Sequence, residues 1–197
     1  SHVRTVKVGD RVSGEGHLIG MKSRMARAGH FHLDPETQGV GVNVPGAFAE
    51  YVKIPAFNAI HLPPEVDDEI GAILDPLGNA VHTALSFDLA GEDVLITGAG
   101  PIGILAAQTL VAWGVNTIIT DLSDARLEFA AQYSGAIPIN VKHEDPVQAV
   151  MRYTKNKGAD FVIEMAANQA AMDDAFDMVR IRGSGAKDFY GLALIGD

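Results

Sequence analysis

Three glycines, Gly98, Gly100 and Gly103, form a G-x-G-x-x-G pattern that follows a short apolar run and opens a helical one. In such a pattern the first glycine permits a sharp turn, the second lets a pyrophosphate approach the backbone, and the third lets the helix pack closely on the sheet. Asp121 lies about twenty residues further on, the distance at which a carboxylate binds ribose hydroxyls. The pattern therefore predicts a dinucleotide site, with a purely structural turn as the alternative.

The residues around Asp121 also bear on which dinucleotide is bound. A carboxylate accepts hydrogen bonds from ribose hydroxyls and repels a 2′-phosphate, and neither Leu122 nor Ser123 supplies a cation to hold that phosphate. NAD is therefore favoured over NADP. Arg126 is placed to cover the adenosine end of the cofactor, and its alternative role is that of a solvated helix charge.

Strands and helices must alternate if these residues are to meet at one edge of a sheet. Residues 76–197 show that alternation, which predicts an α/β fold of the Rossmann type, a doubly wound parallel sheet. Residues 1–75 contain short apolar runs broken by glycine and proline, which predict a smaller β-rich domain with strands near 7–12 and 46–55. The strands expected in the second half are 93–97, 117–120, 137–141, 160–165 and 189–195, and the helices are 101–113, 123–134, 145–158 and 168–179.

Composition excludes several other classes of protein. The 197 residues are 47% hydrophobic and carry a net charge of −10, so nucleic acid and anionic membranes are not expected partners. There is no cysteine, which excludes disulfides, thiolate metal ligands and a thiol nucleophile. We find no apolar run long enough to span a membrane and no leader segment, so a cytoplasmic location is expected.

Four stretches carry a family resemblance: VGDRVSGEGH, GVGVNVPGAFAEYVKIPAFNAI, LDPLGNAVHTALSFDLAGEDVLITGAGPIG and TDLSDARLEFA. They resemble the L-threonine 3-dehydrogenase family of the zinc-dependent medium-chain dehydrogenase/reductase superfamily. The resemblance implies part of a GroES-like domain in residues 1–75, an NAD-binding Rossmann domain without its last strand in residues 76–197, and a homo-oligomer, usually a tetramer. It also implies a small-molecule substrate, with the 3-hydroxyl of threonine oxidised while hydride passes to NAD.

The resemblance assigns further residues to the site. Asp75 matches an acidic residue close to the family's catalytic zinc, although it could instead cap the helix that follows. Ile102 belongs to the cofactor-binding set of the glycine loop. His82 lies in an apolar helix and is expected to be packed rather than catalytic. The residues implied to approach the nicotinamide end are Leu194, Ile195 and Gly196.

The zinc sites of the family are not matched in this sequence. Its catalytic ligands precede the matched region, and the one His-Glu pair, His143-Glu144, is expected to lie on the surface. The four cysteines of its structural zinc lobe align without gaps to Gly20, Ser23, Ala26 and Asp34, so no thiolate site can form.

Other donors occur in the same stretch of the sequence. His30, His32 and Asp34, with His17 nearby, would lie on one face of an extended segment as substitute metal ligands, or simply as a solvated polar face. Zinc is expected for the family, but its ligands are missing here.

Two alternatives to a threonine dehydrogenase stay open at this point. Loss of the zinc ligands suggests a non-catalytic NAD-binding or assembly module. A sibling polyol or butanediol dehydrogenase would share the sheet and the cofactor, although the stretch DPLGNAVHTALS argues against it.

Overall fold

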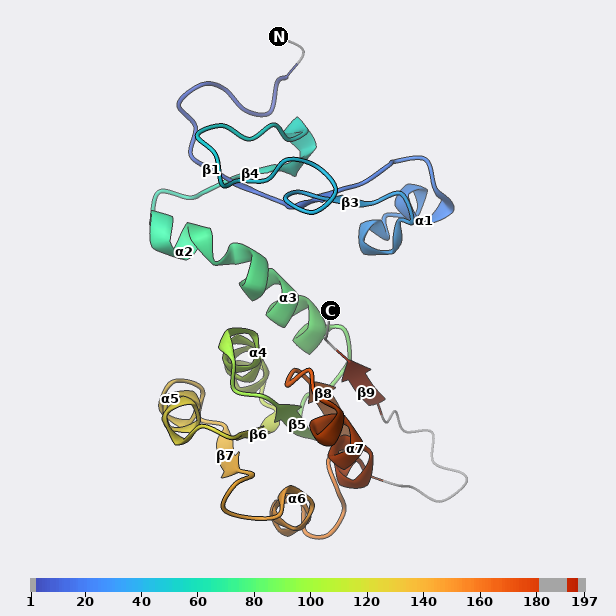
Figure 1. Ribbon diagram of the computed structural model, residues 1–197, viewed down its shortest axis with the longest axis vertical. Helices are drawn as coiled ribbons and strands as arrows, with labels where there is room; N and C mark the ends of the chain where they lie inside the picture. The colour runs from blue at the N-terminus through green and yellow to red at the C-terminus, as the bar shows by residue number, and fades with distance from the viewer. Residues whose placement is uncertain (1–2, 181–190, 195–197) are drawn as a thin grey trace. The chain divides into compact units, whose positions relative to one another are not determined.

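The computed structural model describes residues 3–180 and 191–194, and the chain divides into two compact units, residues 1–75 and 76–197 (Figure 1). The second unit is built on a sheet of five parallel strands in the order β7-β6-β5-β8-β9. These strands are β5 (Asp93–Thr97), β6 (Asn116–Asp121), β7 (Ile137–Asn140), β8 (Phe161–Glu164) and β9 (Gly191–Leu194). The chain leaves β5 toward one edge and returns to its other side at β8, so a crevice opens at the carboxyl ends of these two strands.

The inner strands β5, β6 and β8 bury residues on both of their faces. Val94 and Ile96 of β5 belong to one apolar cluster, whereas Leu95 between them belongs to the other. The first cluster includes residues of α3 (Leu74–Leu85), α4 (Pro101–Ala112) and α5 (Asp124–Ser134), and the second includes residues of α6 (Pro146–Tyr153) and α7 (Gln169–Met178). Figure 1 shows α4 and α5 on one side of the sheet and α6 and α7 on the other. The predicted α/β fold class is confirmed.

Helix ends follow the local signals in the sequence, with one exception. The side chains of Ser123, Asp145 and Asn168 accept hydrogen bonds from backbone N–H groups in the first turns of α5, α6 and α7. Gly135 ends α5 in the left-handed conformation. The predicted end of the third helix at Gly158 is wrong, because α6 stops at Tyr153 and the chain then turns through residues with positive φ angles.

The first unit has little regular structure. Its two antiparallel ribbons pair β1 (Val12–Gly14) with β4 (Ala59–His61) and β2 (His17–Leu18) with β3 (Gln38–Gly39). Asn58 connects the ribbons, because its buried Nδ2 donates to the carbonyl oxygens of Glu15 and His17 at 2.9 and 2.8 Å. Two short helices complete the unit, α1 (Arg24–Arg27) and α2 (Asp68–Ala72), with 3-10 turns at Phe31–Leu33 and Ala56–Asn58.

The prediction of a strand at 46–55 is wrong. No strand forms there among the described residues, and Phe48 and Tyr51 are fully or almost fully exposed. Alternating apolar residues produce a strand only where a neighbouring strand can accept their hydrogen bonds. Between residues 3 and 75, Ala26 is the one hydrophobic residue that is buried. The first unit is therefore much more weakly packed than the second.

In the described residues no helix is long and apolar enough to cross a membrane.

Replacing Gly103 with alanine is expected to destabilise the second unit by about 2–3 kcal/mol. A Cβ atom at Gly103 would lie 2.0 Å from the carbonyl oxygen of Gly98, and backbone cannot rotate away as a side chain can. Urea denaturation of Gly103→Ala measures this loss. Gly78→Ala is the matched control, since a Cβ there meets no atom within 4 Å and alanine is the better helix former. Equal stability of the two variants would contradict the close approach of α4 to β5.

Candidate functional site: a crevice at the carboxyl edge of the sheet

The glycine loop joins β5 directly to α4. Gly98 has a φ of +95°, and a Cβ atom on it would lie 3.0 Å from the backbone of Met165 and Ala166 in the neighbouring loop. Gly100 is the N-cap of α4, and a Cβ on it would meet nothing within 4 Å. The two glycines therefore have different roles: the first allows two loops to pack together, and the second leaves open space at the start of the helix.

The amino end of α4 differs from those of the other helices at this edge of the sheet. No side chain caps α4, whereas α5, α6 and α7 each have a capping side chain. Pro101 occupies the first helical position and has no N–H to satisfy. The N–H groups of the first turn and the positive end of the helix dipole are thus placed to bind an anion.

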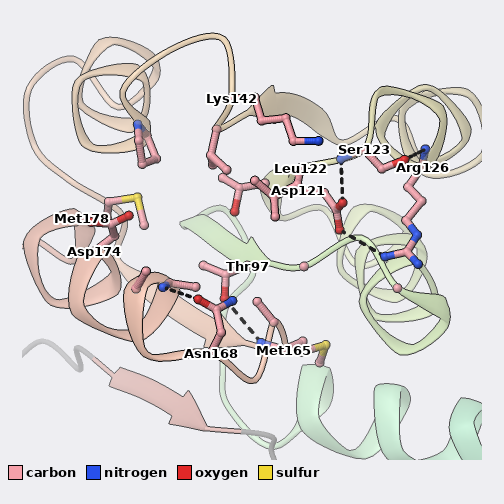
Figure 2. A pocket seen from close by; sticks show the side chains of 18 residues that line it. Thr97, Asp121, Leu122, Ser123, Arg126, Lys142, Met165, Asn168, Asp174 and Met178 are labelled. Atoms are coloured by element: carbon pink, nitrogen blue, oxygen red, sulfur yellow. Dashed lines mark hydrogen bonds and ion pairs between the residues drawn. The ribbon is translucent and has the colours of Figure 1, made fainter.

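A cavity of roughly 590 Å³ lies over this end of the sheet, and it is of the size of small-molecule sites (Figure 2). Its walls come from four successive connections between strands and helices. The residues that line it are Thr97, Gly98, Gly100, Thr120, Asp121, Leu122, Ser123, Arg126, Val141, Lys142, Pro146, Met165, Ala166, Asn168, Ala170, Ala171, Asp174 and Met178. Of the residues predicted to bind a cofactor, the cavity is lined by Gly98, Gly100, Asp121 and Arg126.

Asp121 is the last residue of β6, and its side chain links the connection after β5 to the connection after β6. Its Oδ2 accepts a hydrogen bond from the N–H of Ala99 in the glycine loop, and its Oδ1 accepts one from the N–H of Ser123, both at 2.8 Å. The Asp121 side chain is only 10% exposed. Each carboxylate oxygen has two lone pairs, so each retains one for a ligand hydroxyl. Asp121 therefore both fixes the shape of the glycine loop and presents acceptors to the cavity.

Arg126 lies in the first turn of α5, with its guanidinium Nη1 3.9 Å from Oδ2 of Asp121. The Arg126 side chain is 62% exposed, so the pair is screened by water and contributes little to stability. Lys142, which follows β7, also lines the cavity, and Figure 2 shows it on the opposite side of Asp121 from Arg126. Sequence reasoning missed Lys142 because it considered only the residues that follow Asp121 along the chain.

Glu164 is a buried acid beside the glycine loop that sequence reasoning also missed. It ends β8 with 1% of its surface exposed, and its Oε1 accepts hydrogen bonds from the Thr97 hydroxyl at 3.1 Å and the Ala166 N–H at 2.8 Å. Glu164 thereby ties the end of β5 to the loop after β8, on the side of the glycine loop away from Asp121. A polar residue at the end of an apolar strand is the signal that could have found it.

The other predicted site residues belong to α3, α4 and β9 or lie outside the described residues. Ile102 packs against the apolar core instead of lining the cavity. Asp75 is the second residue of α3, where it is exposed and favourably placed at the positive end of the helix dipole rather than at the N-cap position. Leu194 ends β9, whereas Ile195 and Gly196 lie outside the described residues.

The structure also locates the two histidines that were considered for catalysis. The expectation that His82 is packed is wrong, because it lies on the exposed side of α3 while Thr83 and Ala84 are buried. His143 and Glu144 make separate surface contacts: the His143 ring lies 3.3 Å from the Asp124 carboxylate, and Glu144 forms an ion pair with Arg152 at 2.8 Å.

Comparison with known proteins identifies related dehydrogenases. The family model for zinc-binding dehydrogenases matches residues 101–186. Over 183 residues the chain is 54% identical to an L-threonine 3-dehydrogenase of Ruegeria pomeroyi, which covers 92% of this chain and 54% of the relative. An L-threonine 3-dehydrogenase of Deinococcus radiodurans is 49% identical over 198 residues, covering 100% of this chain and 55% of the relative. The chain thus spans about half the length of these curated relatives.

Solved structures of alcohol dehydrogenases have the same fold. An alcohol dehydrogenase from Thermus sp. ATN1 is 31% identical with a TM-score of 0.79, covering 90% of this chain and 54% of that one. An Escherichia coli alcohol dehydrogenase solved in complex with NADH is 28% identical with a TM-score of 0.76, covering 87% of this chain and 51% of that one. The chain is therefore similar to zinc-binding dehydrogenases, whose family model matches its residues 101–186. Its relatives are oxidoreductases, and L-threonine 3-dehydrogenases match it over most of its length.

The segment that the family resemblance matches to a structural zinc lobe is organised by hydrogen bonds in this protein. Asp34 is buried, its Oδ2 accepts a hydrogen bond from the Gly20 N–H at 2.6 Å, and the Ser23 hydroxyl also bonds to it. Ser23 in turn accepts from the Ala26 N–H at 3.0 Å and caps α1. The four positions aligned with cysteines are therefore linked to one another through the Asp34 carboxylate and the Ser23 hydroxyl.

The donors in this lobe do not fit a zinc ion. The expectation of an extended segment is wrong, because Phe31–Leu33 forms a 3-10 turn, which removes the alternation that would place His30, His32 and Asp34 on one face. His17 instead pairs with Glu15 at 2.6 Å. Within the residues that the structure describes, no three His, Cys, Asp or Glu side chains gather closely enough to hold a metal.

Asp34→Asn is expected to loosen this lobe, measured as faster hydrogen exchange at the Gly20 amide. Hydrogen bonds from the Ser23 hydroxyl and the Gly20 N–H, which outweigh the effect of burial, hold the pKa of Asp34 below its usual value of 3.8. Its stabilising effect is therefore complete above about pH 3.8 and is lost as the pH falls through the lower pKa of the folded state. The exposed Glu65→Gln is the matched control. Unchanged exchange in Asp34→Asn would show that other contacts hold the lobe.

Proposed function

We propose that residues 76–197 bind NAD and that the longer protein to which this chain corresponds oxidises the 3-hydroxyl of L-threonine with this cofactor. The observation that carries the proposal is the uncapped amino end of α4, which opens on a cavity also lined by Asp121. A pyrophosphate at this helix end would accept hydrogen bonds from backbone N–H groups, and Asp121 would accept them from the hydroxyls of the adenosine ribose.

Three features of the cavity support a dinucleotide over a smaller ligand. The space beside Gly100 is free of other atoms within 4 Å of a Cβ position, so a phosphate can approach the backbone. Arg126 supplies a cation beside Asp121, and Leu122, Val141 and Pro146 supply apolar surface for an adenine ring. The NADH complex of the related Escherichia coli dehydrogenase supports the same choice.

The proposals for the substrate and the reaction rest on the relatives that are named L-threonine 3-dehydrogenase. In such a reaction hydride leaves carbon readily only from an alkoxide, and a zinc ion supplies that activation by lowering the pKa of the alcohol. Asp75 is proposed as an acidic residue near the reacting hydroxyl in the longer protein. We further propose that the longer protein is a homo-oligomer in the cytoplasm and that its substrate is a small alcohol.

The poor fit of zinc to the described residues favours a second function for the 197-residue chain by itself, that of a cofactor-binding module without catalysis. The proposed cofactor site belongs to residues 76–197 and requires no metal. Binding and turnover are therefore separable in this chain, and each has its own test.

Gly100→Ser is expected to weaken NADH binding at least tenfold without destabilising the protein. Serine is a good N-cap residue, so its hydroxyl would bond to the N–H groups of the first turn and stabilise α4 by roughly a few tenths of a kcal/mol relative to glycine. The same hydroxyl would occupy the N–H groups and the space that the pyrophosphate needs. Fluorescence titration with NADH and urea denaturation measure the two effects, with Gly78→Ala as the control. Unchanged NADH binding in a stable Gly100→Ser variant would contradict the proposed phosphate site.

The purified chain is expected to show no zinc-dependent oxidation of threonine above the blank. The described residues gather no set of three metal ligands, so the activation of the alcohol is missing. Absorbance of NADH with threonine, NAD and added Zn²⁺ measures turnover, and NADH binding by the same preparation serves as the control. Zinc-dependent turnover that a chelator abolishes would show that the chain assembles a catalytic metal site.

A further inference from the structure

We propose that Asp174 is a specificity-determining residue of the cofactor crevice, where its carboxylate accepts a hydrogen bond from the 6-amino group of the adenine ring. This inference rests on the proposed function, because it assumes that the adenosine ribose lies beside Asp121. It goes beyond that function by assigning a residue to the choice of purine base, which neither the glycine loop nor Asp121 decides.

Asp174 is an acceptor without a partner in the described part of the chain. It lies midway along α7, lines the cavity and is partly buried, and no hydrogen bond or ion pair joins its carboxylate to another described residue. The other acids of this helix are accounted for, since Asp173 accepts a hydrogen bond from Gln169 at 2.7 Å and Asp177 is exposed to water. A partly buried carboxylate is expected to find a donor, and here a ligand in the cavity can supply it.

The surroundings of Asp174 in the cavity are apolar. The other lining residues that α6 and α7 contribute are Pro146, Ala170, Ala171 and Met178. None of these side chains can donate or accept a strong hydrogen bond, so they suit the flat face of a purine ring. Asp174 is thus the one lining side chain of these two helices that can read the polar edge of such a ring.

A dinucleotide bound as proposed would bring its base to this wall. The pyrophosphate would lie at α4, which packs on one face of the sheet, and the ribose would lie at Asp121 on the carboxyl edge. Because α6 and α7 cover the opposite face, a base that continues past the ribose reaches them across this edge. Figure 2 shows Asp174 and Arg126 on opposite sides of Asp121, which agrees with a base that extends from the ribose toward α7.

A carboxylate at this place selects among purine bases. An ionised carboxylate only accepts hydrogen bonds, and the amino group is the donor that adenine offers on its edge. In hypoxanthine an oxygen replaces this amino group, so the carboxylate would face a second acceptor and lose the bond. A site built to bond an N–H group rejects the analogue that lacks it, because the protein acceptor is then left unpaired. Asp174 is therefore expected to favour adenine.

The test compares NADH with reduced nicotinamide hypoxanthine dinucleotide by fluorescence titration of the 197-residue chain and its variants. The wild-type chain is expected to bind NADH about tenfold more tightly, the effect of one hydrogen bond to a charged group. Asp174→Ala is expected to weaken NADH about tenfold and the hypoxanthine dinucleotide less than about twofold. Asp174→Asn carries both an acceptor and a donor, so it should bind the two dinucleotides within about threefold of each other.

Asp177→Ala is the matched control, because Asp177 is an exposed acid of the same helix that does not line the cavity. It should change the binding of neither dinucleotide. Alanine is the better helix former at both positions, and urea denaturation confirms that the variants are folded.

The outcomes separate this inference from the proposed function. If the wild-type chain binds both dinucleotides equally, or if Asp174→Ala weakens both to the same extent or neither, the role of Asp174 is wrong and the cofactor site stands. If the wild-type chain binds neither, the proposed function fails and the inference fails with it. A loss confined to NADH in Asp174→Ala and absent from Asp177→Ala supports the inference.

Discussion

The close approach of α4 to the end of β5 is the constraint on which the crevice depends. Because α4 begins almost directly after β5, its first turn must pack against the backbone at the end of that strand. Here the carbonyl oxygen of Gly98 occupies the position where any side chain at Gly103 would begin. That contact fixes where the uncapped N–H groups of α4 lie, and the rest of the crevice is arranged around them.

Two carboxylates, that of Asp121 and the buried one of Glu164, hold the glycine loop from opposite sides. Asp121 accepts an N–H from the loop itself, and Glu164 accepts the hydroxyl of Thr97 just before it. Both acids end strands that pair directly with β5, so the sheet register places each of them beside the loop. The shape of the crevice is therefore set by main-chain and carboxylate contacts that exist before any ligand binds, and a ligand need not order the loop.

Much of this arrangement could be predicted from the sequence of the second unit. Strands such as β5 are continuous apolar runs, and Ser123 and Gly135 mark the two ends of α5 as expected. Lys142 could not be found in this way, because its place at the crevice depends on the order of strands in the sheet. In the first unit the apolar residues around Phe48 predicted a strand, but pairing requires a neighbour that local sequence does not specify.

The walls of the crevice come from four separate connections, each of which follows a strand of the sheet. Thr97, Asp121, Lys142 and Asn168 stand in or beside different loops, whereas the apolar side chains that stabilise the sheet lie behind them. Substitutions in one loop can thus alter ligand preference while the folding core keeps its composition. The fold is in this sense modular, and lineages that share the sheet are free to diverge in the nucleotide that they use.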